Sequence, residues 1–386
     1  MLEGIGFVFS VIVGLFLLVL LVVVHELGHA IAARRNGVVV EEFGIGFPPR
    51  AWAKKLKNGV LFTINWLPLG GFVKLQGEHD AASKKGDYGA ASLWAKTKIL
   101  LAGVFINWLT AVVLFTGLAL FGLPKVIDNQ FSVASDTTEI NQPVTVATVS
   151  KGSPADTLGL ERGDQLIRFA GQAVERPSDL SDLTEQFKGK SVEVIYKRDG
   201  SENIDRLTLR DDNSDGKGYL GVGASQRSKL KSTWSAPIVA VGLTGQLTQL
   251  TFQGLGDMLA KLGTGIVGKF STNDQTQKQA DSDLGTVGQS VAGPLAILGI
   301  LFPSAQEAGL SELLFMTALI SLALAIMNLL PIPALDGGRW FVTMLFRVIR
   351  RPLTKDIEER IHGTGFLVLM GLFVLVTIAD IGKFAG

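Results

Sequence analysis

Charge-free apolar runs alternate with polar segments along this chain. The first run, Ile5–Val24, covers about 20 residues and would extend roughly 30 Å as a helix. That length is enough to cross the hydrocarbon core of a bilayer. Three further runs are free of charge: Ile99–Leu123, Leu313–Leu330 and Gly363–Ala379. The pattern therefore predicts a polytopic α-helical membrane protein with four transmembrane helices, of which the first is uncleaved and continues to about Ala33.

Composition supports this class. Of the 386 residues 47% are hydrophobic and 18% are charged, and the mean hydropathy is +0.35. A soluble enzyme with this charge content would be less apolar. The net charge of +1 gives no indication of nucleic-acid binding, and no nucleic acid is expected among the partners.

The distribution of basic residues predicts the orientation. Residues 34–98 hold eleven Lys or Arg against five Asp or Glu, and six basic residues lie between Arg339 and Arg360. Cytoplasmic loops of multi-pass proteins carry such an excess. We therefore expect both segments in the cytoplasm, both termini and residues 125–310 outside it, and the chain in the cell inner (cytoplasmic) membrane.

Two stretches of the first basic segment read as strands. Phe43–Phe47 alternates bulky residues with glycine, and Val60–Trp66 places its apolar residues at every second position before the turn Leu69–Val73. Such a membrane-associated β-hairpin or sheet could dip into the bilayer if its backbone groups pair within the protein. A small cytoplasmic β-subdomain is the alternative, and the pattern does not decide between the two.

The hydrophilic residues near 143–223 predict a β-rich module outside the cytoplasm. Short strands are expected at Val144–Val149, Val192–Tyr196 and Arg206–Leu209. Ser153-Pro154-Ala155, followed by Leu158-Gly159-Leu160 and then Gly163-Asp164, resembles the signature of bacterial PDZ domains. A PDZ-like domain binds an extended peptide or a chain terminus by adding it to a sheet edge. A compact spacer without a ligand is the alternative.

The chain then divides into four expected parts. These are residues 1–124 with two transmembrane helices and the β-element, 125–232 with the PDZ-like domain (core about 143–223), 233–310, and 311–386 with the other two transmembrane helices. Within 233–310, apolar residues at helical spacing from Leu243 to Leu262 predict an amphipathic helix. The polar tract Ser271–Asp283 is expected to be a flexible loop, and Leu295–Phe302 an interfacial or re-entrant piece that is too short to span.

The first apolar run ends in His25-Glu26-Leu27-Gly28-His29, which has the H-E-x-x-H pattern. Residues four apart share one face of a helix, so His25 and His29 can both direct imidazole nitrogens at one metal ion. Glu26 can reach water at that ion and take its proton, as the general base does in zinc proteases with this motif. The motif predicts metal-assisted hydrolysis at membrane depth.

The remaining ligand must be a histidine or a carboxylate, because the chain has no cysteine. The first and third apolar runs point in the same direction, so Asp336, just beyond the third, should meet the His25–His29 turn. A carboxylate at a membrane boundary usually pairs with a cation. Asp336 is therefore the expected third ligand, and His79 and His362 remain as rivals.

At this point the chain is identified as similar to the site-2 protease family of intramembrane zinc metalloproteases, in its bacterial PDZ-containing branch. The resemblance rests on His25-Glu26-x-x-His29 and on Asn328…Pro331-x-Pro333-x-Leu335-Asp336-Gly337-Gly338. It implies Zn²⁺ held by His25, His29 and Asp336, with Glu26 as the catalytic base. It further implies substrate contacts through Asn328, Gly70, Gly71 and Phe72.

Two features depart from close relatives in that family. Only one PDZ-like domain is evident instead of two, and Gly103 is followed by Val104 instead of proline. Asn107, four residues after Gly103, is expected to make a structural hydrogen bond between helices.

The expected function is hydrolysis of peptide bonds within or near the transmembrane segments of single-span membrane proteins, such as anti-sigma factors or remnant signal peptides. The expected partners are these substrates, the lipid bilayer, and a peptide or chain terminus at the PDZ-like domain. A catalytically silent scaffold that binds partners through this domain is the alternative. A transporter or metal carrier would need charged residues midway through several spans, and the apolar runs carry none.

Overall fold

The computed structural model describes residues 2–271, 273–290 and 293–385. The chain forms two compact units, one from Met1–Leu118 with Ala236–Gly386 and the other from Ala119–Ser235. Each unit has its own hydrophobic core.

Four helices of the described chain are long and apolar enough to cross a membrane: α1 (Leu2–Arg35), α2 (Leu93–Phe121), α9 (Leu310–Leu329) and α11 (Lys355–Ala385). The prediction of four long apolar helices is thus confirmed. The second and fourth begin six and eight residues before their apolar runs. In α2 the extra turns are stabilised by Ser92, whose hydroxyl accepts from the amide of Ala95 at 3.2 Å.

Strands β1 (Val40–Lys55) and β2 (Leu61–Leu75) form an antiparallel hairpin that curls on itself. Phe43 pairs with both Phe62 and Val73, so residues 42–45 lie between the two halves of β2. The curl requires a sharp bend at Gly46, whose φ is +76° and where a Cβ would overlap the carbonyl oxygen of Leu67. The hairpin packs on the end of α1 around Ala33, Val38 and Leu75.

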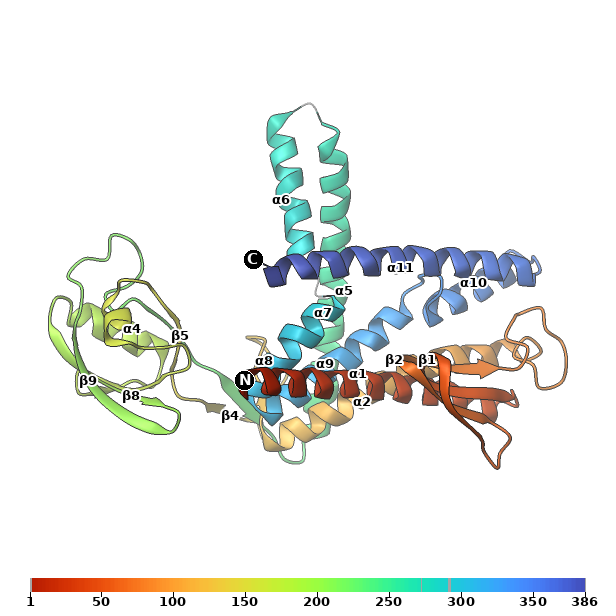
Figure 1. Cartoon of the computed structure of the whole chain (residues 1–386), viewed down its shortest axis with the longest axis horizontal. Helices are drawn as coiled ribbons and strands as arrows, with labels where there is room; N and C mark the ends of the chain where they lie inside the picture. The colour runs from red at the N-terminus through yellow and green to blue at the C-terminus, as the bar shows by residue number, and fades with distance from the viewer. Residues whose placement is uncertain (1, 272, 291–292, 386) are drawn as a thin grey trace. The chain divides into compact units, whose positions relative to one another are not determined.

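The polar tract Ser271–Asp283, predicted as a loop, is helical from Asp274 on, and that part of the prediction is wrong. Thr272 lies outside the described residues. Helix α6 (Asp274–Ser290) runs antiparallel to the long amphipathic helix α5 (Ala236–Lys269), and the two lie side by side in Figure 1. The polar residues face solvent, while Ala280 and Leu284 pack against α5 where Gly268 and Gly265 leave space. A narrow apolar seam is enough to order a helix whose composition is otherwise polar.

The apolar piece predicted at Leu295–Phe302 is helical and continues through Pro303 to Ala308. It is not one of the helices of the described chain that are long enough to span, and its interfacial or re-entrant placement stays a prediction. It consists of α7 (Pro294–Ala296), a π-helical turn (Ile297–Leu301) and α8 (Phe302–Ala308). The carboxylate of Asp380, on α11, accepts from the amides of Gly293 at 3.2 Å and Ala296 at 3.0 Å. This caps the first turn of the segment. Helix α10 (Asp336–Val348) follows α9.

The second unit is β-rich, in agreement with the predicted PDZ-like domain, and we use that name for residues 119–235. Its larger sheet has the order β10-β5-β6-β8-β9, with β7 added to β6. The strands are β5 (Thr145–Val149), β6 (Gln165–Phe169), β7 (Gln172–Ala173), β8 (Ser191–Arg198), β9 (Ser201–Thr208) and β10 (Val222–Ser225). A second sheet has the order β3-β11-β4, formed by Leu123–Pro124, Ser228–Lys231 and Thr138–Asn141.

Two helices accompany the larger sheet, α3 (Pro154–Leu158) and α4 (Pro177–Gln186). Ser153 caps α3 by accepting from the amide of Asp156 at 3.2 Å, and Gly159 ends it in the left-handed conformation. The helix and tight turn expected from the Ser-Pro-Ala signature are therefore present. Val144, Phe169 and Val194 are fully buried in the core of this unit.

Candidate active site

One turn of α1 and the first turn of α10 meet at a cluster of three ligand atoms. The Nε2 atoms of His25 and His29 lie 3.1 Å apart, and Oδ2 of Asp336 lies 3.0 Å from the first and 3.2 Å from the second. Both histidines are buried. Ligand atoms about 2.0–2.1 Å from one tetrahedral ion lie about 3.3 Å apart, so two imidazoles and a carboxylate at this spacing fit Zn²⁺.

The second nitrogen of each imidazole is held by a polar group. Nδ1 of His29 donates to the carbonyl oxygen of Ile99 at 2.8 Å, which leaves Nε2 with a free lone pair. Nδ1 of His25 lies 3.3 Å from the side-chain amide of Asn107. The amide oxygen of Asn107 is buried and has no hydrogen-bond partner within the described chain. Turning this amide by 180° would let that oxygen accept from His25 Nδ1 and give both histidines the same tautomer.

Asn107 was predicted only to link helices, and the structure gives it a more specific neighbour. Its backbone carbonyl does accept from the hydroxyl of Ser321 on α9 at 2.8 Å, so it also joins two helices. The contact with His25 was missed. The four-residue spacing of Gly103 and Asn107 on α2 equals that of His25 and His29 on α1, and this match was the available signal.

Gly103 lets α2 approach the imidazoles closely. A Cβ at this position would overlap Nε2 of His29 and lie 2.6 Å from Cε1 of His25. Gly28 lets α1 approach the backbone of α2 in the same way, since a Cβ at this position would lie 2.8 Å from the carbonyl oxygen of Ala102. The backbones of α1 and α2 therefore lie in direct contact at this point, and the close packing restricts the orientation of both histidine side chains.

Glu26 is half-buried on the neighbouring face of α1. Its carboxylate interacts with the backbone amide of Val73, and its Cγ would lie 3.6 Å from a Cβ at Gly71. Residues 71–74 of β2 pair with β1 on one side only, so they form an outer edge of the curled sheet. This edge lies next to the predicted base, where an extended chain could add as a further strand.

The other predicted substrate-binding residues differ in their surroundings. Gly70 has a φ of +82° and faces the ring of Phe47, and Phe72 packs over Gly44 in the same hairpin. Asn328 lies in the last turns of α9, where its side-chain amide donates to the carbonyl oxygen of Leu324 at 3.1 Å. The structure therefore brings Gly71 to Glu26, and it gives Asn328 a partner within its own helix.

A polar cavity of about 530 Å³ opens beside Asp336. Its wall contains both rival histidines. His79 lies 3.6 Å from the carboxylate of Glu359, and Nδ1 of His362 accepts from the amide of Ala334 at 3.2 Å. The structure brings neither of them to the cluster of His25, His29 and Asp336, the one metal-compatible group found among the described residues.

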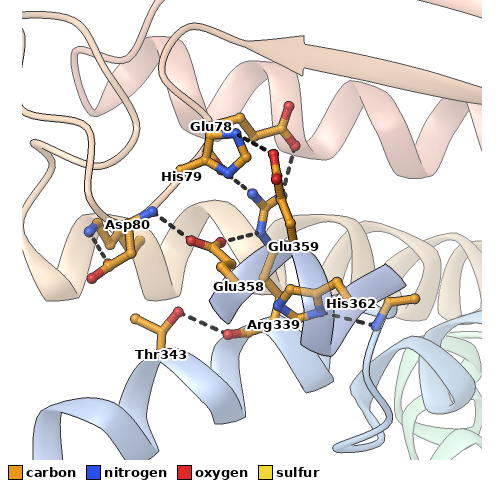
Figure 2. Close-up of polar contacts among 10 residues, drawn as sticks. Glu78, His79, Asp80, Arg339, Thr343, Glu358, Glu359 and His362 are labelled. Atoms are coloured by element: carbon orange, nitrogen blue, oxygen red, sulfur yellow. Dashed lines mark hydrogen bonds and ion pairs between the residues drawn. The ribbon is translucent and has the colours of Figure 1, made fainter. Parts of the chain in front are cut away.

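Arg339 fixes the start of α10 one turn after Asp336. Its guanidinium lies 2.7 Å from the carboxylate of Glu78 and 3.5 Å from that of Glu358, and Figure 2 shows it between the two. It also lies 5.3 Å from the centre of the Tyr88 ring. Burial alone would lower the pKa of Arg339, but the charge of Glu78 raises it above its ordinary value, so the group stays charged. These contacts tie α10 and α11 to the loop after β2.

Comparison with known proteins places the chain in a family. The model of peptidase family M50 matches residues 13–372. A "putative zinc metalloprotease" of Clostridium perfringens is 31% identical over 94% of this chain and 95% of its own length. The metalloprotease MmpA of Caulobacter vibrioides is 26% identical over 98% of this chain and 97% of its own.

A solved PDZ domain from an SdrC-like protein of Listeria monocytogenes also matches. The identity is 23%, the TM-score is 0.20, and the match covers 21% of this chain and 86% of that domain. The family match extends over nearly the whole chain and includes the His25–His29 turn and Asp336. The chain therefore belongs to peptidase family M50, the site-2 protease family of zinc metalloendopeptidases.

Proposed function

We propose that this chain cleaves peptide bonds within or near the transmembrane segments of single-span membrane proteins. One observation carries the proposal: a metal-compatible cluster of His25, His29 and Asp336 lies beside a carboxylate, Glu26, on a helix apolar enough to cross a bilayer. Anti-sigma factors and remnant signal peptides are substrates of the expected kind.

The roles of the residues follow from their positions. Zn²⁺, when held by His25, His29 and Asp336, would polarise the scissile carbonyl and make water a better nucleophile near neutral pH. Glu26 accepts the proton of the attacking water and then delivers it to the leaving nitrogen. The carbonyl of Ile99 holds His29 in the ligand tautomer, and Asn107 would hold His25 in the same tautomer with its amide turned so that the oxygen faces Nδ1.

The substrate must be unwound before it can react, because a helix hides its carbonyls in hydrogen bonds. The outer edge of β2 at residues 71–74, next to Glu26, offers backbone groups to a substrate strand. Gly71 and Phe72 belong to this edge and Gly70 directly precedes it, and we also assign a contact with the substrate backbone to Asn328. Small, helix-weakening residues in the target would lower the cost of unwinding.

We further propose four membrane crossings with both termini and the PDZ-like domain outside the cytoplasm, in the inner membrane. The support is the excess of basic residues in residues 34–98 and 339–360. The active site then lies near the cytoplasmic side. The PDZ-like domain would act as a size filter or bind a newly exposed peptide terminus.

Reconstitution tests the function directly. The full chain is mixed in detergent with a single-span substrate, and cleavage is followed with and without a zinc chelator. Glu26→Gln and chelation should each abolish product, whereas Glu202→Gln, an exposed change in the PDZ-like domain, should leave the rate unchanged. Equal cleavage by wild type and Glu26→Gln would favour the silent scaffold.

A further inference from the structure

An apolar groove lies between α1 and the β-hairpin, on the side of α1 away from the ligand cluster. It has a volume of about 260 Å³. One wall is the stripe Leu27, Ile31 and Arg34 of α1, and the other is formed by side chains of β1 and β2, including Phe43 and Phe62. At 100° per residue, Leu27 and Ile31 lie about 120–160° around the helix from His25 and His29.

The groove is apolar along its length and basic at one end. Leu27, Ile31 and Arg34 follow one face of α1 over roughly 10 Å, so the apolar stripe ends in a guanidinium. The turn between the strands also lines the groove, through Asn58. Within it Asn58 accepts from the amide of Val60 at 3.2 Å, which leaves the side-chain NH₂ of Asn58 as a donor towards the groove.

The basic groups at this end have no acidic partners among the described residues. Arg34 and Arg35 are exposed at the end of α1, and Lys54, Lys55 and Lys57 are exposed beside the turn. The nearby acidic groups are already engaged: Glu42 binds Arg50 at 2.7 Å, and Glu41 binds Lys74 at 3.0 Å. A local positive charge is therefore left for an external anion.

The position along α1 matches the boundary between acyl chains and headgroups. Leu27 and Ile31 are 46% and 41% exposed, so both present apolar surface that a lipid can cover. Arg34 follows within two turns. Trp52, 48% exposed, lies on β1 with its ring 6.1 Å from that of Phe62 in the groove wall. Amphipathic aromatic and basic side chains gather at this depth in membrane proteins.

We propose that the groove binds one anionic phospholipid. An acyl chain lies along Leu27 and Ile31 against Phe43 and Phe62, and the phosphate is bound by Arg34 with the NH₂ of Asn58. The lysines of the turn add long-range attraction. A phospholipid carries an apolar chain next to an anionic phosphate, and the groove has an apolar stripe next to a basic group. A substrate strand engaged at Glu26 would lie on another face of α1.

Native mass spectrometry of the full chain in detergent tests the proposal, with phosphatidylglycerol and phosphatidylcholine as the probes. Arg34→Gln is compared with Arg35→Gln, which removes the same charge outside the groove. Ile31→Trp, which fills the groove, is compared with Leu20→Trp, an equally exposed position on the same face of α1 but outside the groove.

The wild-type chain should retain one phosphatidylglycerol about fivefold more than phosphatidylcholine, and Arg34→Gln should lose that preference while Arg35→Gln keeps it. Ile31→Trp should lose both lipids, and Leu20→Trp should lose neither. Equal retention of the two lipids by wild type, equal loss in Arg34→Gln and Arg35→Gln, or displacement of the lipid by a single-span substrate peptide would each overturn the assignment.

Discussion

Nε2 of His25 and Oδ2 of Asp336 lie 3.0 Å apart although 311 positions separate them along the chain. A half-buried carboxylate and a buried imidazole at this distance either share a proton or share a cation. The second nitrogen of His25 faces Asn107, and His29 brings a third donor to the same point. Three converging lone pairs favour the cation.

Asp336→Ala should therefore bind zinc far below one equivalent, because two neutral imidazoles alone hold the ion weakly. Zinc content of the purified full chain, measured by elemental analysis, checks this. His362→Ala is the matched control, since His362 lies in the cavity wall beside the cluster without joining it. If Asp336→Ala retained zinc and His362→Ala lost it, the third ligand would be His362 and not Asp336.

Gly103→Ala should disturb the same site without removing a ligand. The added methyl group would overlap the imidazole of His29 and press on that of His25, so we expect zinc affinity to fall by about 10–100-fold, as for changes to groups that orient ligands. Gly117→Ala, in the same helix with open space around its Cβ, is the control. Competition with a chelator measures the zinc affinity of both variants. Equal affinities would contradict the close approach of Gly103 to the two imidazoles.

The ligand cluster could be predicted from the sequence, and its supporting residues could not. The spacing of His25 and His29 is local, and the direction of the third apolar run brought Asp336 to the same depth. The contact of Asn107 with His25 depends on how two helices are rotated and shifted against each other. An apolar run carries little information on that rotation, because its residues are similar on every face.

The fold shows the same division between local and long-range information. The four apolar helices and the signature of α3 were readable from local patterns. Helix α6 was not, because its order depends on Ala280 and Leu284 meeting glycines of α5. The groove beside Ile31 was also not visible, since it exists only where the hairpin packs on α1.

The PDZ-like domain should lose stability in acid through Asp164. Its carboxylate binds the guanidinium of Arg198 at 2.6 Å and 2.7 Å and accepts from the amide of Glu161. Burial alone would raise the pKa of Asp164, but these hydrogen bonds lower it below its ordinary value. The stabilisation is present above the unfolded pKa, about 3.9, and is lost as pH falls through the lower folded value.

Asp164→Asn should then reduce the free energy of unfolding of this domain by about 2 kcal/mol at pH 7 and flatten its pH dependence below about pH 4. Denaturant unfolding of the full chain, monitored through hydrogen exchange in β6 and β8, measures this free energy. Asp182→Asn, an exposed change on α4, should behave as wild type. The same acid sensitivity in Asp164→Asn and wild type would show that another group is responsible.

The α5–α6 hairpin should open when its seam is filled. A Cβ at Gly265 would lie 2.7 Å from Cγ of Leu284, so Gly265→Val should separate the helices at this level and expose the amides of α6. Gly285→Ala, which has open space around its Cβ, should if anything stabilise α6 by removing a glycine from a helix interior.

Hydrogen exchange of residues 274–288 in the full chain distinguishes these outcomes. Faster exchange in Gly265→Val alone is expected, because the polar helix has few apolar contacts beyond this seam to hold it. Exchange as slow as in wild type would mean that α6 is ordered by its own propensity, and faster exchange in Gly285→Ala would mean that the packing at Gly265 is not what orders it.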